Sequence, residues 1–157
     1  MQLLMVNQLK TPEERLRELG IELGQPRQAV GNYVSCVRSG NLIFTSGQGV
    51  DQYKGKLGID LTVEDGYAAC RQSMINLITV LKAELGDLSK VKRIVKILGM
   101  VNSATDFTDQ PKVMNGASDL LVEVFGERGK HARSAVGMAQ LPNNTAIEIE
   151  MIVETED

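Results

Sequence analysis

Few side chains in this 157-residue sequence could perform chemistry. His131 is the only histidine, which excludes a metal site built from several histidines and a relay of histidines. Cys36 and Cys70 lack metal-ligand spacing and lie in apolar patterns, so we expect two buried thiols. A nucleophilic cysteine–histidine pair would need one of these thiols beside His131. We expect no metal site.

Arg133 and Glu148 are the other candidates. Arg133 opens an apolar segment directly after a charged stretch (127–130), so it is either a loop charge or a fixed cation for an anionic ligand. Glu148 and Glu150 alternate with apolar residues and share one face of a strand. They form either a solvated polar face or a carboxylate pair. The residue types alone leave both choices open.

Composition narrows the class of protein. Hydrophobic residues make up 43% of the chain and charged residues 24%, which is typical of soluble globular proteins. A net charge of −3 without long runs of like charge argues against a broad nucleic-acid surface. No segment reaches the roughly 18 apolar residues of a membrane helix, and the first ten residues lack the pattern of a signal peptide. We therefore expect a cytoplasmic protein without membrane partners.

Three helices are predicted. A short one over about 12–19 begins after Thr11, and Glu14 completes a capping box. Two longer helices, over 62–86 and 110–125, each carry an apolar stripe at helical spacing and should pack on a core.

Strands make up the rest of the pattern. Runs rich in β-branched residues predict strands at 33–38, 42–46, 91–102 and 146–154, and the segment opened by Arg133 predicts another. The order is strand, strand, helix, strand, helix, strand, strand. It predicts an α+β fold in which two helices pack on one face of a mainly antiparallel sheet. We expect a single domain over 1–157.

The last two strands are joined by turn-forming residues at 142–145, which predicts a hairpin. In that hairpin Glu148 faces Ala139. Arg133 then lies about 20 Å from this pair, at ~3.3 Å per residue. Arg133 and Glu148 could share a small-molecule site only if they came from neighbouring subunits. A shared site and an oligomer are therefore one hypothesis.

Three short motifs resemble those of one known family. They are TSGQ (45–48), ARSAVGMAQLP (132–142) and IEIEMIV (147–153). The family is YjgF/RidA, also called endoribonuclease L-PSP, and its opening hairpin is similar to residues 29–48. The resemblance covers about residues 25–153. Its most specific part is the arginine–serine pair that opens a strand, followed by Leu-Pro and the Ile-Glu-Ile-Glu run.

The resemblance implies a chorismate-mutase-like α+β fold, assembled as a homotrimer with clefts between subunits. For the RidA branch it implies hydrolysis of enamine/imine intermediates such as 2-aminoacrylate to a 2-oxo acid and ammonia, without metal or cofactor. The residue matching the carboxylate-binding arginine is Arg133, whose guanidinium can form two parallel hydrogen bonds. The residue matching the glutamate near the attacking water is Glu148. By the same resemblance Gly47, after Ser46, supplies a backbone N–H, and Tyr33 forms an aromatic wall.

The sequence departs from the family pattern at several points. Ala135 stands where the family often has a cysteine, although its backbone carbonyl could still hold the water. Because the segment 107–131 is long, the family's helix asparagine matches either Asn115 or Ser118. The helix over 12–19 is extra. These differences suggest a longer-chain subgroup.

Two other functions remain open. In a non-catalytic module that binds small carboxylates as a sensor or carrier, Arg133 would be essential and Glu148→Gln would leave binding intact. Endoribonuclease activity follows from the older family label. An acidic chain with one histidine and 4% aromatic residues offers little for RNA stacking or acid–base cleavage. RNA cleavage abolished by His131→Ala would support it.

Overall fold

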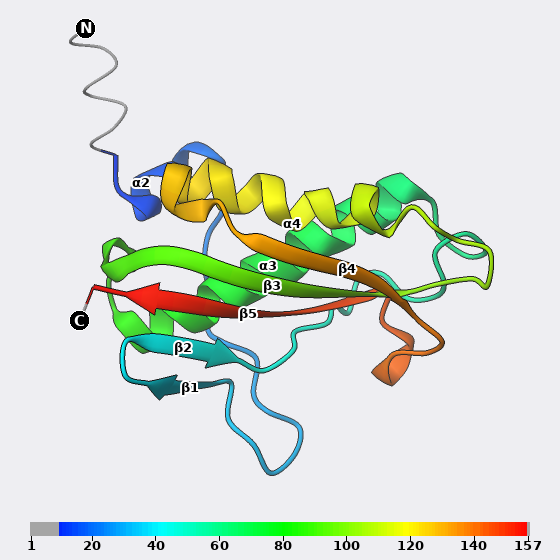
Figure 1. Cartoon of the computed structure of the whole chain (residues 1–157), viewed down its shortest axis with the longest axis horizontal. Helices are drawn as coiled ribbons and strands as arrows, with labels where there is room; N and C mark the ends of the chain where they lie inside the picture. Colours follow the sequence, from blue (N-terminus) through cyan, green and yellow to red (C-terminus); the bar gives the residue numbers. More distant parts are fainter. Residues whose placement is uncertain (1–9, 157) are drawn as a thin grey trace, which may run out of the picture.

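The computed structural model describes residues 10–156 as two layers, with helices on one side of a sheet (Figure 1). The helices are α2 (Pro12–Glu18), α3 (Val63–Leu85) and α4 (Gln110–Phe125), with short 3₁₀ helices η1 (Leu88–Lys90), η2 (Gly126–Gly129) and η3 (Pro142–Asn144). The strands are β1 (Cys36–Ser39), β2 (Leu42–Thr45), β3 (Val91–Asn102), β4 (Ala132–Met138) and β5 (Ile147–Thr155). The predicted α+β class and element order are confirmed. The first strand is shorter than predicted, so Tyr33 lies in the loop before β1.

Local signals in the sequence account for the helix ends. The Thr11 hydroxyl accepts a hydrogen bond from the Glu14 N–H (3.1 Å), as the predicted capping box requires. α3 ends at Gly86, whose φ of 77° is readily adopted by glycine. α3 and α4 pack so closely that a Cβ on Gly116 would lie 2.0 Å from the carbonyl oxygen of Tyr67. The two helices therefore form one continuous layer.

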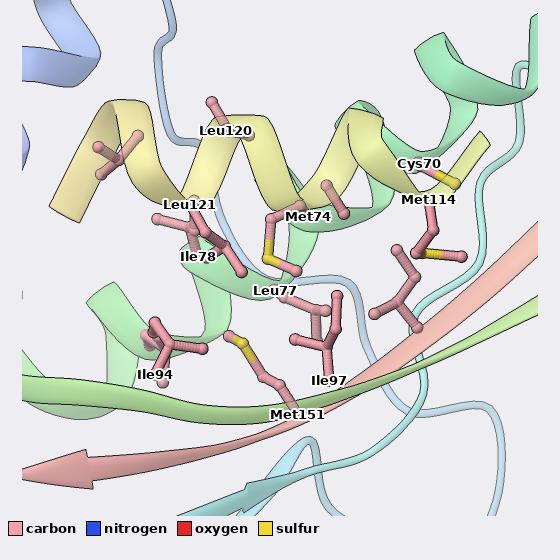
Figure 2. Close-up of a cluster of buried hydrophobic side chains, with 14 of the residues drawn as sticks. Cys70, Met74, Leu77, Ile78, Ile94, Ile97, Met114, Leu120, Leu121 and Met151 are labelled. Carbon is pink, nitrogen blue, oxygen red and sulfur yellow. The ribbon is translucent and has the colours of Figure 1, made fainter. Parts of the chain in front are cut away.

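The core lies between this helix layer and the sheet (Figure 2). Side chains from both helices meet side chains from β3 and β5: Met74, Leu77, Ile78 and Leu121 face Ile94, Ile97 and Met151. β5 alternates as predicted, with Ile147, Ile149, Met151 and Val153 buried. Glu148, Glu150 and Ile152 therefore point to the opposite face of the sheet.

The strand order is β1-β2-β5-β3-β4, so the predicted hairpin between the last two strands is wrong. β3 separates them: it runs parallel to β4, where Ile97 pairs with Arg133, and antiparallel to β5, where Met100 pairs with Glu148. The reason is the crossover through α4, which returns the chain to the start of β3 before β4 begins. The turn at 142–145 then carries the chain past the end of β3 instead of joining neighbours.

The face of the sheet opposite α3 and α4 carries apolar side chains. Val37, Phe44 and Val136 are exposed there, and the strand register places Leu98 and Met100 on the same face. None of the helices in residues 10–156 covers this face (Figure 1). In the same part of the chain, no helix has the length and apolarity that a membrane span requires.

Candidate functional site

A cavity of about 350 Å³ opens where three segments meet. They are the loop before β1, the segment after β2, and the start of β5 with the turn that precedes it. Four of the predicted site residues line it: Tyr33, Ser46, Gly47 and Glu148. Arg133 and Ala135 are not among its lining residues.

A β-bulge shapes one wall of this cavity. Phe44 pairs with Ile152, and Gln48 pairs with Ile149. The segment from β2 to Gln48 therefore contains one residue more than the part of β5 that it pairs with, which is a β-bulge. The Gln48 N–H donates to the carbonyl of Ile149 (2.9 Å). The Gly47 N–H makes no hydrogen bond to any described residue. The extra residue therefore leaves a backbone donor free, which is the group that the predicted role of Gly47 requires.

Glu148 occupies the space that the absent side chain of Gly47 leaves. A Cβ on Gly47 would lie 2.4 Å from Oε2 of Glu148, so glycine lets the carboxylate lie against the backbone. Burial, and to a lesser extent the charge of Glu150, raises the pKa of the Glu148 carboxyl group. No side chain or backbone N–H within residues 10–156 donates to it. A carboxylate with a raised pKa is a stronger base than an ordinary glutamate and therefore suits proton transfer.

Ser46 and Tyr33 contribute to the cavity in different ways. The Ser46 hydroxyl donates to the carbonyl of Val34 (2.6 Å), and the Ser46 N–H donates to that of Ser35 (2.9 Å). Ser46 therefore ties the loop before β1 to the bulge. The Tyr33 hydroxyl accepts from the Val30 N–H (3.4 Å), while the side chain is half exposed beside the cavity. Its ring is available for contact with a ligand.

Two basic residues in the lining, Arg27 and Lys54, were not predicted from the sequence. Arg27 donates to the carbonyl of Gly49 (2.7 Å) and to the carboxylate of Asp51 (3.0 Å), which braces the loop after the bulge. These contacts arise from the packing of two irregular loops, so no spacing in the sequence signals them.

Arg133 lies on the helix side of the edge strand β4. Its guanidinium donates to three acceptors of α4: Oδ1 of Asn115 (2.9 Å), Oγ of Ser118 (3.1 Å) and the carbonyl of Pro111 (3.3 Å). An arginine has five N–H donors, so two remain for a ligand. The sequence left open which of Asn115 and Ser118 belongs near the site. Both contact the arginine, because residues three apart share one face of a helix.

Ala135 follows Arg133 on the same face of β4, since the two residues are separated by one position in an extended strand. Its side chain packs against the core. Only its backbone is therefore left for a polar role.

The thiols do not form the cysteine–histidine pair considered above. His131 contacts Ser118 and Gly129 instead. Cys70 is buried, and burial raises the pKa of its thiol well above the usual range. Cys36 is only partly buried, which corrects the expectation of two buried thiols. It lies at the start of a short edge strand, where less of the sheet covers it.

Arg133 and Glu148 point to opposite faces of the sheet. Arg133 pairs with Ile97, which is buried under the helices, whereas Glu148 pairs with Met100 on the other face. One small molecule cannot contact both side chains of the same chain. The sequence led to the same conclusion through a hairpin that does not exist; the opposite orientation of the two side chains is the actual reason.

The sequence profile of the family described as "YjgF/chorismate_mutase-like, putative endoribonuclease" matches residues 13–155. The chain belongs to the YjgF/RidA family. The matched YjgF/RidA region contains the bulge, Glu148 and Arg133.

Relatives and solved structures agree with this assignment. Protein TCP17 of Trypanosoma cruzi is 46% identical over 145 residues, which is 88% of this chain and 91% of TCP17. The 2-iminobutanoate/2-iminopropanoate deaminase of Escherichia coli strain K12 is 35% identical over 127 residues, covering 79% of this chain and 88% of the deaminase. The crystal structure of a candidate endoribonuclease from Shewanella oneidensis superposes with a TM-score of 0.89 at 40% identity, covering 92% of this chain and 99% of that one. The YjgF/RidA fold is thus shared nearly end to end.

Proposed function

We propose that this protein hydrolyses reactive 2-imino acids, and the enamines from which they form, to 2-oxo acids and ammonia. It acts as a cytoplasmic homotrimer with sites between subunits. One observation carries the proposal: the Glu148 carboxylate, with its raised pKa, lies in a cavity beside the unpaired N–H of Gly47. The name of the 35% identical Escherichia coli relative supports the substrate class.

Glu148 acts as the base in this reaction. It takes a proton from water while the water oxygen bonds to the imine carbon, and it returns that proton to nitrogen, which gives a carbinolamine. The hydroxyl proton of the carbinolamine then passes through Glu148 to nitrogen as the C–N bond breaks, which leaves the 2-oxo acid and ammonia. The backbone carbonyl of Ala135 of a neighbouring subunit holds the water. An imine carbon is already electrophilic, so a positioned water and a base suffice without metal or cofactor.

Arg133 binds the substrate carboxylate. Its two remaining N–H donors match the two carboxylate oxygens, and the α4 contacts hold the guanidinium in place beforehand. Because Arg133 and Glu148 of one chain face opposite ways, Arg133 of a neighbouring subunit completes the cavity around Glu148.

The uncovered sheet face supports assembly. Val37 is 55% exposed, Phe44 42% and Val136 39%, and large apolar side chains gathered on one face favour burial against another copy. A closed three-fold ring lets each copy supply Glu148 to one neighbour and Arg133 to the other.

The direct test is release of 2-oxo acid from 2-aminoacrylate generated enzymatically in the assay. Wild type should accelerate release. Arg133→Ala should lose roughly 2–3 kcal/mol of transition-state stabilisation, since it removes a charge-assisted contact. Glu148→Gln should abolish most turnover while keeping affinity for pyruvate. Wild-type protein without effect on the release would contradict the proposal.

Mixing the two variants tests the shared site. Subunits carrying Arg133→Ala and subunits carrying Glu148→Gln are each inactive alone. After joint refolding of equal amounts, roughly one interface in four across all the trimers formed pairs an intact arginine with an intact glutamate. Recovery of about a quarter of wild-type activity is expected. No recovery in mixed trimers would contradict sites between subunits.

Two further measurements separate this proposal from the alternatives. Calorimetry that detects pyruvate binding, combined with absent turnover, would favour a non-catalytic binding module. Cleavage of RNA that depends on His131 would favour a ribonuclease.

A further inference from the structure

Three hydrogen bonds in series connect the loop after α4 to Arg133. The carbonyl oxygen of Gly129 lies 2.6 Å from Nδ1 of His131. Nε2 of the same ring lies 2.9 Å from Oγ of Ser118, and that oxygen lies 3.1 Å from Nη1 of Arg133. The series uses the only histidine of the sequence, which the proposed reaction leaves without a role.

The chemistry of the partners determines the direction of each bond. A carbonyl oxygen can only accept, so Nδ1 of His131 carries the hydrogen. In the neutral ring Nε2 is therefore an acceptor, and the Ser118 hydroxyl donates to it. The lone pairs of Ser118 are then left for the N–H of Arg133. All three bonds thus point from the arginine toward the backbone of Gly129.

The far end of the series is fixed by packing. A Cβ on Gly129 would lie 2.1 Å from the carbonyl oxygen of Leu121, so the backbone at this point lies directly on α4. His131 and Arg133 are two positions apart where the chain becomes extended, which places their side chains on one face. The ring of His131 is therefore held between Ser118 of α4 and the backbone of Gly129.

From this geometry we infer, given the proposed function, that His131 is a positioning residue: through Ser118 it orients Arg133 toward the substrate carboxylate. A free serine hydroxyl rotates and presents either its hydrogen or its lone pairs. With His131 taking the hydrogen, Ser118 always presents lone pairs to the guanidinium. The arginine is then ordered before the ligand arrives, which lowers the entropic cost of binding.

Ser118 and His131 also have the distance of a nucleophile and its base. One observation favours positioning: the Ser118 oxygen is already engaged by the guanidinium of Arg133 (3.1 Å). Covalent labelling of Ser118 by a serine-directed fluorophosphonate would overturn the inference in favour of a nucleophile.

Kinetics and pyruvate binding at pH 8 provide the first test. Ser118→Ala and His131→Phe should each raise KM and the Kd for pyruvate roughly fivefold, the effect of one hydrogen bond, with kcat nearly unchanged. His131→Gln retains an acceptor near Nε2 and should bind almost as wild type. Lys130→Ala, an exposed neighbour paired with Glu127 (2.8 Å), is the control.

The double variant Ser118→Ala/His131→Phe gives the sharpest result. If His131 acts through Ser118, the double variant should bind pyruvate no worse than either single variant. Independent roles would multiply the two effects to roughly 25-fold and overturn the inference. So would wild-type affinity in His131→Phe.

Nitrogen NMR of the single histidine tests the series without any activity. Wild type should show the hydrogen on Nδ1, and Ser118→Ala should shift the Nε2 resonance. A hydrogen on Nε2 at pH 8, or an unchanged resonance in Ser118→Ala, would overturn the inference. The NMR test does not depend on the folding of His131→Phe, because it uses only wild type and Ser118→Ala. Absent deaminase turnover in wild type would instead contradict the proposed function and leave the NMR result to decide on the positioning role.

Discussion

The regions around Arg133 and Glu148 carry opposite charges, and they differ in the hydrogen bonds that those charged groups make. Arg133 is braced by three acceptors of α4 before any ligand binds. Glu148 has no hydrogen-bond donor among residues 10–156, and burial raises the pKa of its carboxyl group. A braced cation loses little freedom when it binds an anion, whereas an unpaired carboxylate keeps its affinity for a proton. The first arrangement suits the binding of an anion, and the second suits proton transfer.

The neighbouring elements explain why the Arg133 guanidinium has several hydrogen-bond partners and the Glu148 carboxylate has none in the described part of the chain. A helix face supplies side-chain and backbone acceptors at fixed spacing, and β4 runs alongside α4, so the arginine finds several partners at once. The bulge after β2 interrupts a ladder and supplies an unpaired N–H, with a glycine against which the carboxylate lies.

The largest effect should come from closing the space beside the carboxylate. In Gly47→Ala the new methyl group overlaps Oε2 of Glu148 and forces the carboxylate to rotate away. We expect kcat/KM for 2-aminoacrylate to fall about 100-fold, the effect of removing a general base. The melting temperature should change little, because the glutamate is flexible. Gly24→Ala, which enters open space, is the control. Retained activity in Gly47→Ala would show that the carboxylate need not lie against the backbone.

Replacing Arg133 by lysine should separate the effect of its hydrogen bonds to α4 from the effect of its positive charge. Arg133→Lys keeps the positive charge, but an ammonium group cannot reach the α4 acceptors and a carboxylate in the planar arrangement of a guanidinium. KM should rise roughly 30-fold, corresponding to about 2 kcal/mol, with a smaller change in kcat. Steady-state kinetics on Arg17→Lys, at an exposed position of α2, provides the baseline. Equal KM values for Arg133→Lys and wild type would mean that charge alone suffices.

Removing one of the three acceptors that contact Arg133 should have a moderate effect on ligand affinity. Asn115→Ala deletes a single acceptor of the guanidinium while Ser118 and Pro111 keep theirs. The Kd for pyruvate, measured by calorimetry, should rise roughly fivefold. Lys112→Ala, an exposed change on the same helix, should leave it unaltered. A loss as large as that of Arg133→Ala would indicate that Asn115 contacts the ligand directly.

The smallest effect concerns stability and its dependence on pH. Burial raises the pKa of Glu148 in the folded protein above its unfolded value of about 4.3. The folded state therefore binds this proton more tightly, and the stabilising contribution present at low pH is lost as pH rises through the folded pKa. Glu148→Gln should melt at a higher temperature than wild type at pH 8, and the difference should shrink toward pH 4. A lower melting temperature at pH 8 would mean that the carboxylate is paired.

The elements of the fold follow from local patterns. The apolar stripe of 62–86 predicts α3, and the alternation after residue 146 predicts β5, because both periods are visible within a few residues. The strand order does not follow from such patterns. The turn residues at 142–145 suit a hairpin, and only the crossover through α4 decides that β4 lies on the far side of β3.

Part of the candidate site can be predicted from the sequence. Arg133 and Glu148 lie in segments that resemble family motifs, so the sequence identifies them. The contact between Glu148 and Gly47 depends on a register shift between two strands far apart in sequence, and single residue types do not reveal it. The sequence shows His131 only as a lone histidine, because its contacts with Ser118 in α4 and Gly129 in η2 depend on how the chain folds back after α4.

Because of the bulge, the number of residues between Thr45 and Gln48 matters for the cavity around Glu148 as much as any side chain does. Deleting a single residue between Thr45 and Gln48 would make the ladder with β5 regular, draw the amide of residue 47 into it, and turn the following side chains to the other face. Glu148 would be unchanged in identity and would lose its cavity. Among relatives of this chain, a one-residue gap at this point is therefore a stronger sign of altered chemistry than most substitutions around it.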